Sequence, residues 1–132
     1  QRDELEARCA GRYIQWLGHR TDIRELLQQC HIVAFPSYYR EGVPKSLIEA
    51  CATGRPIVTT HSIGCKDTVE DGVNGFLIPI KDSGALAEKL RTLIENPELR
   101  KRMGEASRRI AERDFGIDDV VEKHLEIYAS LV

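Results

Sequence analysis

The stretch that decides the fold is FPSYYREGVPKSLIEA, residues 35–50. It continues a run of apolar residues that begins at His31, and such a run is typical of a central strand buried on both faces of a parallel sheet. From Pro44 onward the apolar residues have helical spacing, and proline is favoured in the first turn of a helix. Gly54 favours an end at Thr53. The stretch therefore predicts a strand, a loop and a helix in direct succession.

Units of the same kind lie on both sides of this stretch. Tyr13–Leu17 is predicted to form a strand that ends at Gly18, and Asp22–Gln29 a helix that Thr21 or Asp22 caps. Alternation of strands and amphipathic helices predicts an α/β fold, a Rossmann-like parallel sheet flanked by helices. Beyond the central stretch we expect strands at 56–60 and 75–78, a helical turn near 67–70, and helices at 82–95, 97–113 and 117–132.

Length and composition limit the classes of protein. A chain of 132 residues predicts a single domain, residues 1–132, with 117–132 as its C-terminal helix. Nineteen Lys and Arg against 21 Asp and Glu give a net charge of −2, which argues against nucleic acid as a partner because phosphate-binding surfaces are usually basic. No apolar run approaches the roughly 20 residues that span a bilayer. The charged start, without methionine, favours a piece of a longer protein.

Cysteine and histidine form no metal-binding or redox pattern. The cysteines lie far apart without a C-x-x-C pair, so we expect buried reduced thiols in a cytoplasmic protein and no metal site. The basic residues of the 97–113 helix are interpreted as a solvated face, with peripheral attachment at the inner membrane face as the alternative. The residues concerned are Cys9, Cys30, Cys51, Cys65, His19, His31, His61, His124, Arg100, Lys101, Arg102, Arg108 and Arg109.

The loop before Pro44 has the residues of a ligand site. In an open parallel sheet the ligand crevice lies at the carboxyl ends of the strands, where loops lead into helix N-termini that attract anions. Gly42 allows close approach of the backbone, and Lys45 adds a positive charge. The carboxylates of Glu41 on the loop and Glu49 inside the helix suit sugar hydroxyls. A ligand with an anionic middle and hydroxyl-rich ends, such as a nucleotide sugar, fits this pattern.

Each of these residues also has a purely structural interpretation. Glu49 and Lys45 are spaced to form an ion pair on a solvated helix face, and Glu41 has the properties of an ordinary exposed loop acid. Tyr38 and Tyr39 either stack on a sugar or base or cover the loop. The residues alone leave these alternatives open.

The sequence resembles the C-terminal domain of retaining, family-4 glycosyltransferases with the GT-B fold. The resemblance extends over nearly the whole chain, and several motifs occur in the family's order and spacing. The matching segments are 14–18 (IQWLG), 35–37 (FPS), 41–50 (EGVPKSLIEA), 54–58 (GRPIV) and 69–78 (VEDGVNGFLI).

The resemblance implies retaining transfer from a nucleotide-diphosphate sugar, without an obligatory metal, in polysaccharide or glycoconjugate biosynthesis. Glu41 matches the glutamate that contacts the transferred sugar, and Glu49 the one that holds the ribose hydroxyls. Gly42 and Val43, with the N–H groups of Lys45 and Ser46, match the segment beside the donor sugar and diphosphate.

The resemblance also implies that residues 18–22 line the nucleotide base. Arg20, through its main chain, and Asp22 are the candidates for base contacts, and a helix cap is the alternative for Asp22. One departure is IGCKD (63–67), where the family usually has two glycines followed by a glutamate; Asp67 keeps that charge on a shorter arm.

A second departure concerns length. The family's C-terminal domain begins with two further strand–helix units, and the acceptor binds an N-terminal domain. An absent strand would lie between the strand at 13–17 and the strand that ends at Phe35, so we expect an inactive fragment that forms a homodimer, exchanges elements or rearranges its pairing.

The functional alternative is a non-catalytic GT-B-like module that binds partners through its exposed helices, such as 117–132. A phospho-acceptor regulatory domain is disfavoured, because no cluster of aspartates follows Leu17.

Overall fold

The computed structural model describes residues 3–4, 7, 10–11, 13–39 and 42–130. Its centre is a three-stranded parallel sheet in the order β1-β2-β3, with Val33 of β1 level with Ile57 of β2 and Gly75 of β3. The prediction of an α/β fold with a parallel sheet is confirmed. The strands are β1 (Val33–Phe35), β2 (Ile57–Thr60) and β3 (Gly75–Ile78).

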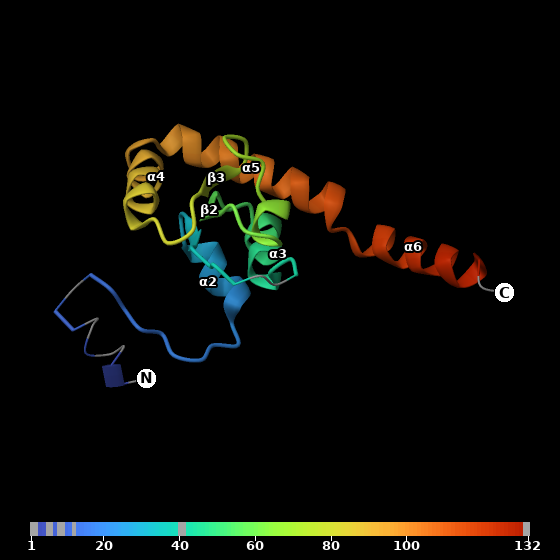
Figure 1. Cartoon of the computed structure of the whole chain (residues 1–132), viewed down its shortest axis with the longest axis horizontal. Helices are drawn as coiled ribbons and strands as arrows, with labels where there is room; N and C mark the ends of the chain where they lie inside the picture. The colour runs from blue at the N-terminus through green and yellow to red at the C-terminus, as the bar shows by residue number, and fades with distance from the viewer. Residues whose placement is uncertain (1–2, 5–6, 8–9, 12, 40–41, 131–132) are drawn as a thin grey trace.

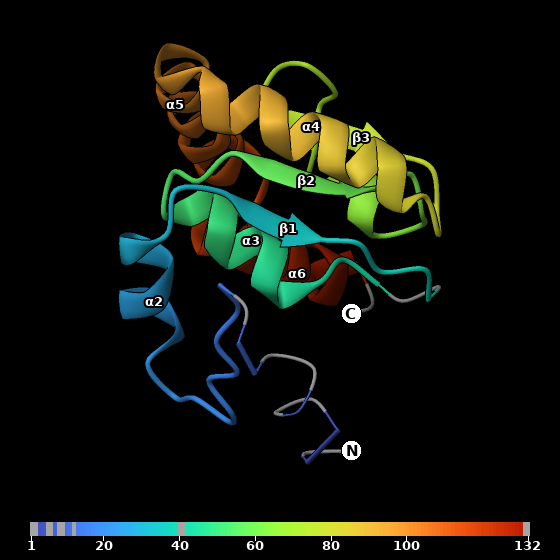
Figure 2. The ribbon, with the colours of Figure 1, turned by 90° about the vertical axis from the view of Figure 1, so that its left-hand side faces the viewer.

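Helices cover both faces of this sheet. Figure 2 shows α3 (Lys45–Ala52) on one side and α4 (Ser83–Glu95) on the other. All four residues of β2 are buried, and because side chains alternate along a strand they reach opposite faces. Ile57 packs in a cluster with Leu47 of α3, whereas Val58 packs with Leu93 of α4. β2 is therefore the central strand.

Helix α5 (Pro97–Asp114) joins the two layers. Met103 belongs to the cluster under α4, and Ala111 belongs to the cluster under α3. Glycine permits the close approach of α5: a Cβ atom on Gly104 would lie 2.4 Å from the carbonyl oxygen of Gly54. The buried hydroxyl of Ser107 donates a hydrogen bond of 2.7 Å to the carbonyl of Arg55. These contacts fix α5 against the turn between α3 and β2.

The helix boundaries follow local chemistry. The Asp82 carboxylate accepts a hydrogen bond from the amide of Ala85 (2.8 Å), and thereby caps α4. Asn96 caps α5 in the same way, with Pro97 in the first turn. Arg100 donates to the last carbonyls of α4, Leu93 and Ile94, at 2.7 Å each. Arg100 therefore stabilises a helix end, and the prediction that it belongs to a merely solvated face is wrong.

The remaining elements precede, connect or follow these layers, and among their residues Leu27 and the buried Cys65 pack in the cluster under α3. These elements are α2 (Ile23–Gln29), the 3-10 turn η1 (Cys65–Asp67) and α6 (Ile117–Ser130). In Figure 1, α6 extends away from the body, and none of its residues is buried. No helix in the described part of the chain is long and apolar enough to cross a membrane.

Two predictions about strands are wrong. Residues 13–17 form no strand and are exposed, because they pair with no strand of the described sheet and no layer covers them. β1 lies at an edge of the described sheet rather than at its centre, and Ala34 is exposed. A strand needs a neighbour for its backbone groups, and an apolar run does not reveal whether that neighbour is present.

The thiols agree with the prediction of reduced cysteines as far as the described residues reach. Cys51 and Cys65 are buried, Cys30 is half-buried, and all three are free; Cys9 lies outside the described residues. Burial raises the pKa of the Cys51 thiol to about 11, as expected when the charged form is removed from water.

Candidate functional site

Buried hydroxyls hold the loop that follows β1 against the end of β2. Thr59 donates a hydrogen bond of 2.8 Å to the carbonyl of Phe35, and Thr60 donates to the carbonyl of Ser37. Thr60 is 1% exposed and also bonds the Ser62 hydroxyl at 2.9 Å. The sequence does not reveal these groups, because their partner carbonyls lie 24 and 23 residues away along the chain. The two hydroxyls fix where the loop begins.

The loop ends at a helix tip that no side chain of the described residues caps. Pro44 occupies the N-cap position of α3, and its carbonyl accepts the first hydrogen bonds, from Leu47 (3.0 Å) and Ile48 (3.3 Å). The amide N–H groups of Lys45 and Ser46 precede these bonds, and both residues are exposed. Unused N–H groups together with the helix dipole make such a tip an anion-binding position.

The approach to this tip is open on the side of the loop. Gly42 and Val43 are exposed, and a Cβ atom on Gly42 would meet nothing within 4 Å. Glu41 lies outside the described residues, as does Arg40. The position of Glu41 beside the tip therefore stays a prediction.

Glu49 lies one turn inside α3, and its side chain is 37% exposed. Its carboxylate lies 3.6 Å from the Lys45 ammonium, so the ion pair that the sequence analysis raised as the alternative is present. An exposed pair of this kind contributes only about 0–1 kcal/mol. It leaves the Glu49 carboxylate able to accept hydrogen bonds from a ligand hydroxyl.

Arg20 and Asp22 pair with each other ahead of α2. Arg20 Nε donates to Asp22 Oδ1 at 2.7 Å, and Arg20 Nη2 donates to Oδ2. The Arg20 hydrogen bonds lower the pKa of Asp22. Asp22 occupies the N-cap position, but its side chain caps nothing. The predicted cap is wrong, because a fork of two charge-assisted hydrogen bonds outcompetes a single backbone amide.

The two tyrosines of the loop stack on one another. The ring centroids of Tyr38 and Tyr39 lie 4.5 Å apart with 28° between the ring planes, and the Lys81 ammonium lies 5.0 Å from the Tyr38 ring centroid. Both rings are exposed. Asp67, at the position where the sequence departs from the family pattern, is exposed in η1.

Comparison with known proteins assigns the family. A profile of the family described as glycosyl transferases group 1 matches residues 2–110. The chain belongs to this family.

Relatives of known name are similar to nearly all of the chain. It is 35% identical over 121 residues to the putative glycosyltransferase EpsD of Bacillus subtilis, covering 92% of this chain and 31% of that protein. It is 33% identical over 120 residues to an N,N'-diacetylbacillosaminyl-diphospho-undecaprenol α-1,3-N-acetylgalactosaminyltransferase of Campylobacter jejuni, covering 90% and 31%. The chain thus spans about a third of the length of these relatives. Both names describe glycosyltransferases.

Solved structures of the same kind confirm the fold. The Anabaena protein Alr3699/HepE in complex with UDP is 29% identical, with a TM-score of 0.90 over 97% of this chain and 36% of that one. Its complex with UDP-glucose has a TM-score of 0.88 at the same identity and coverage. The C-terminal domain of LpcC from Francisella tularensis, at 24% identity, has a TM-score of 0.73 over 88% of this chain and 63% of that one, which shows the fold alone. The chain has the α/β fold of part of a GT-B glycosyltransferase.

Proposed function

We propose that the chain binds the nucleotide-diphosphate sugar donor of a retaining glycosyltransferase, and that transfer takes place in a longer protein. The observation that carries this proposal is the uncapped tip of α3 with Glu49 one turn inside it, in a chain of the group 1 family. The Anabaena neighbours, which bind UDP and UDP-glucose, support a nucleotide sugar as the ligand.

In this proposal the nucleotide-diphosphate sugar lies across the N-terminal tip of α3. The N–H groups of Lys45 and Ser46 bind the diphosphate and stabilise the charge that grows on it as the bond to the sugar breaks. Glu41 contacts the transferred sugar, and Gly42 and Val43 let the backbone lie beside it. Glu49 accepts hydrogen bonds from the ribose hydroxyls.

The base lies against residues 18–22 in this proposal. Arg20 offers its main chain, while its guanidinium group already holds Asp22; contact between Asp22 and the base uses the face of the carboxylate that Arg20 leaves open. Breaking the Arg20–Asp22 pair with Arg20→Gln is expected to change affinity for uridine nucleotides less than Glu49→Gln does.

Donor binding in this proposal needs no obligatory metal, because the helix tip itself supplies positive potential to the diphosphate. UDP-glucose affinity is therefore expected to be the same with and without EDTA. We also propose a cytoplasmic location, with the inner membrane face as the place where an acceptor would be met.

Further partners are proposed for the longer protein. An N-terminal domain would hold the acceptor, and chain elements beside β1 would pair with its free edge, where Ala34 is exposed. By itself the chain is expected to bind donor weakly, to transfer poorly and to form homodimers through this edge. Light scattering that gives the mass of one chain, together with cooperative thermal unfolding, would contradict the homodimer.

A titration with UDP-glucose tests the proposal. Loss of charge-assisted hydrogen bonds worth about 1.5–3 kcal/mol corresponds to an affinity about 10- to 150-fold weaker for Glu49→Gln. The matched control is Glu122→Gln, because Glu122 is an exposed glutamate on the projecting helix α6. Glu41→Ala is expected to weaken binding as well. An unchanged affinity in Glu49→Gln would refute the proposed ribose contact, and an unchanged affinity in Glu41→Ala would remove Glu41 from the site.

A further inference from the structure

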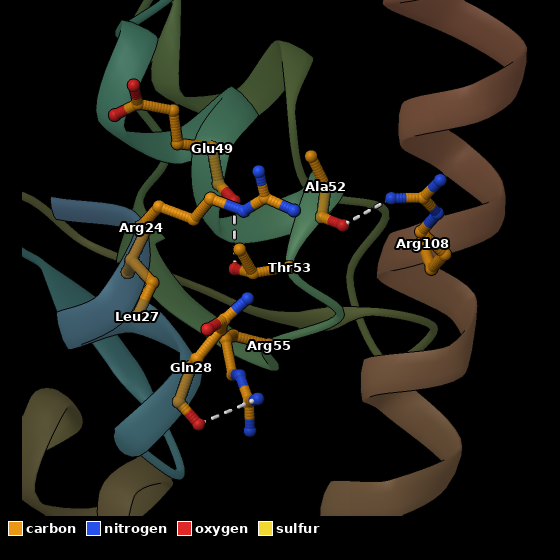
Figure 3. Close-up of a pocket in the computed structure, with 8 residues that line it drawn as sticks. All are labelled: Arg24, Leu27, Gln28, Glu49, Ala52, Thr53, Arg55 and Arg108. Carbon is orange, nitrogen blue, oxygen red and sulfur yellow. Dashed lines mark hydrogen bonds between the residues drawn. The ribbon is translucent and has the colours of Figure 1, made fainter.

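A polar hollow separate from the N-terminal tip of α3 lies between α2 and the C-terminal half of α3. Figure 3 shows that it is bounded by α2, the C-terminal half of α3 and one side chain of α5, and its volume is about 550 Å³. Its position distinguishes it from the α3 tip, because Ala52 and Thr53 at the other end of the helix line it. The lining residues are Arg24, Leu27, Gln28, Glu49, Ala52, Thr53, Arg55 and Arg108.

Two of the three lining arginines use only part of their hydrogen-bonding capacity. Arg55 Nη2 donates to the carbonyl of Gln28 at 3.1 Å, and Arg108 donates to the carbonyl of Ala52 at 2.7 Å. Arg108 also pairs with Glu112 at 2.7 Å. Arg55 Nε is buried and has no acceptor among the described residues. A buried donor of this kind calls for an acceptor that the chain does not itself supply.

The whole guanidinium group of Arg24 is available to a ligand in the hollow. It reaches from α2 toward Thr53 (Figure 3), and no acceptor for it is found among the residues that the structure describes. The only acidic lining residue is Glu49. Its carboxylate points away from the other lining side chains (Figure 3) and pairs with Lys45. Positive charge is therefore in excess in this hollow.

We propose that this hollow binds a phosphate group, either free or as part of a small phosphorylated molecule. Guanidinium groups match the oxygens of phosphate in a fork of two hydrogen bonds, and Arg24 and Arg55 carry the donors that lack acceptors. Leu27 and Ala52 provide apolar wall for the rest of such a molecule. A volume of about 550 Å³ lies in the usual range of small-molecule sites.

The test is a titration of the full chain with inorganic phosphate at low ionic strength, followed by backbone amide shifts. Shifts are expected at Leu27, Gln28 and Thr53. Arg24→Gln is expected to weaken binding about 10-fold, and its fold should be intact because Arg24 is an exposed residue on α2. The matched control is Arg102→Gln, an exposed arginine of α5 outside the lining, which should change affinity less than about 2-fold.

Further experiments distinguish free phosphate from a phosphorylated small molecule, and the hollow from the proposed donor site. Glucose 1-phosphate that binds more tightly than phosphate supports a phosphorylated small molecule, and equal affinity supports free phosphate. Arg24→Gln should spare UDP-glucose binding, whereas Glu49→Gln should weaken UDP-glucose binding without weakening phosphate binding, because it removes a negative charge from the lining. Equal phosphate affinity in Arg24→Gln and the unaltered chain, or shifts confined to the α3 tip, would overturn the inference. Donor binding that stays sensitive to Glu49→Gln in that case would leave the proposed function standing.

Discussion

Replacing Thr60 with valine tests the hydroxyl that holds the loop leading to the α3 tip. Thr60 is 1% exposed, donates to the carbonyl of Ser37 and bonds the Ser62 hydroxyl. Valine fills nearly the same volume, so the change removes the hydrogen bonds without opening a cavity. Ser62 is 9% exposed and Ser37 is half-buried, so water replaces the lost partner only in part.

The expected cost follows from these burials. A buried polar group left without a partner costs about 1–3 kcal/mol, and here two groups lose theirs, one of them close to water. We therefore expect the free energy of unfolding to fall by about 2 kcal/mol. The free energy of unfolding falls by about 2 kcal/mol per M of urea, so the urea concentration at the midpoint of unfolding should decrease by about 1 M. Far-ultraviolet circular dichroism measures this shift directly.

Two controls make the result interpretable. Thr92→Val removes a hydroxyl that donates to the carbonyl of Glu88 at 3.0 Å on an exposed helix face, and it should cost less than about 0.5 kcal/mol. Thr60→Ser keeps the hydroxyl and should recover most of the loss. The reasoning is refuted if Thr60→Val unfolds at the same urea concentration as Thr92→Val.

Two further outcomes are expected. A Cβ atom on Gly75 would lie 1.9 Å from the Ile57 carbonyl oxygen, so Gly75→Ala should abolish cooperative thermal unfolding. The control is Gly42→Ala, which should still unfold cooperatively because a Cβ atom there would meet nothing within 4 Å. Cooperative thermal unfolding of Gly75→Ala would contradict this prediction. Because burial raises the Cys51 pKa from 9.0 to about 11, the stabilisation from its neutral thiol is complete below pH 9 and is lost as pH rises toward 11. The difference in unfolding free energy between the unaltered chain and Cys51→Ala should therefore shrink over that range in urea titrations, and a constant difference would contradict it.

The sequence predicts the helix starts well, because neighbouring residues determine them. Asp82 lies three residues before the amide it caps, and Asn96 does the same for α5 beside Pro97. The uncapped tip at Pro44 also follows from local sequence, because proline fixes the backbone and brings no side-chain acceptor.

What the sequence does not predict depends on distant partners. Thr60 meets a carbonyl 23 residues away, and Ser107 meets one 52 residues away, so neither bond has a local pattern. The predicted strand at 13–17 is wrong, because the residue pattern favours a strand but does not show whether a neighbouring strand is present to pair with it. The cap at Asp22 failed through a residue only two positions away, since Arg20 competes for the carboxylate with two hydrogen bonds.

The arginine-lined hollow escaped the sequence analysis for the same reason. Arg24, Arg55 and Arg108 are spread along the chain, and folding of α2, α3 and α5 brings them to one place. The sequence places Arg108 on a solvated helix face, whereas in the structure its side chain donates to the carbonyl of Ala52 at the end of α3. A basic residue in an amphipathic helix gives no sign of the helix end that it will meet.

The most direct test of the donor site is a map of backbone amide shifts on adding UDP-glucose to the chain. The account predicts the largest shifts at the amides of Lys45 and Ser46, with smaller ones at Gly42 and Glu49, and their loss in Glu49→Gln. Shifts that instead cluster on α4 or α6, with Lys45 and Ser46 unaffected, would contradict it.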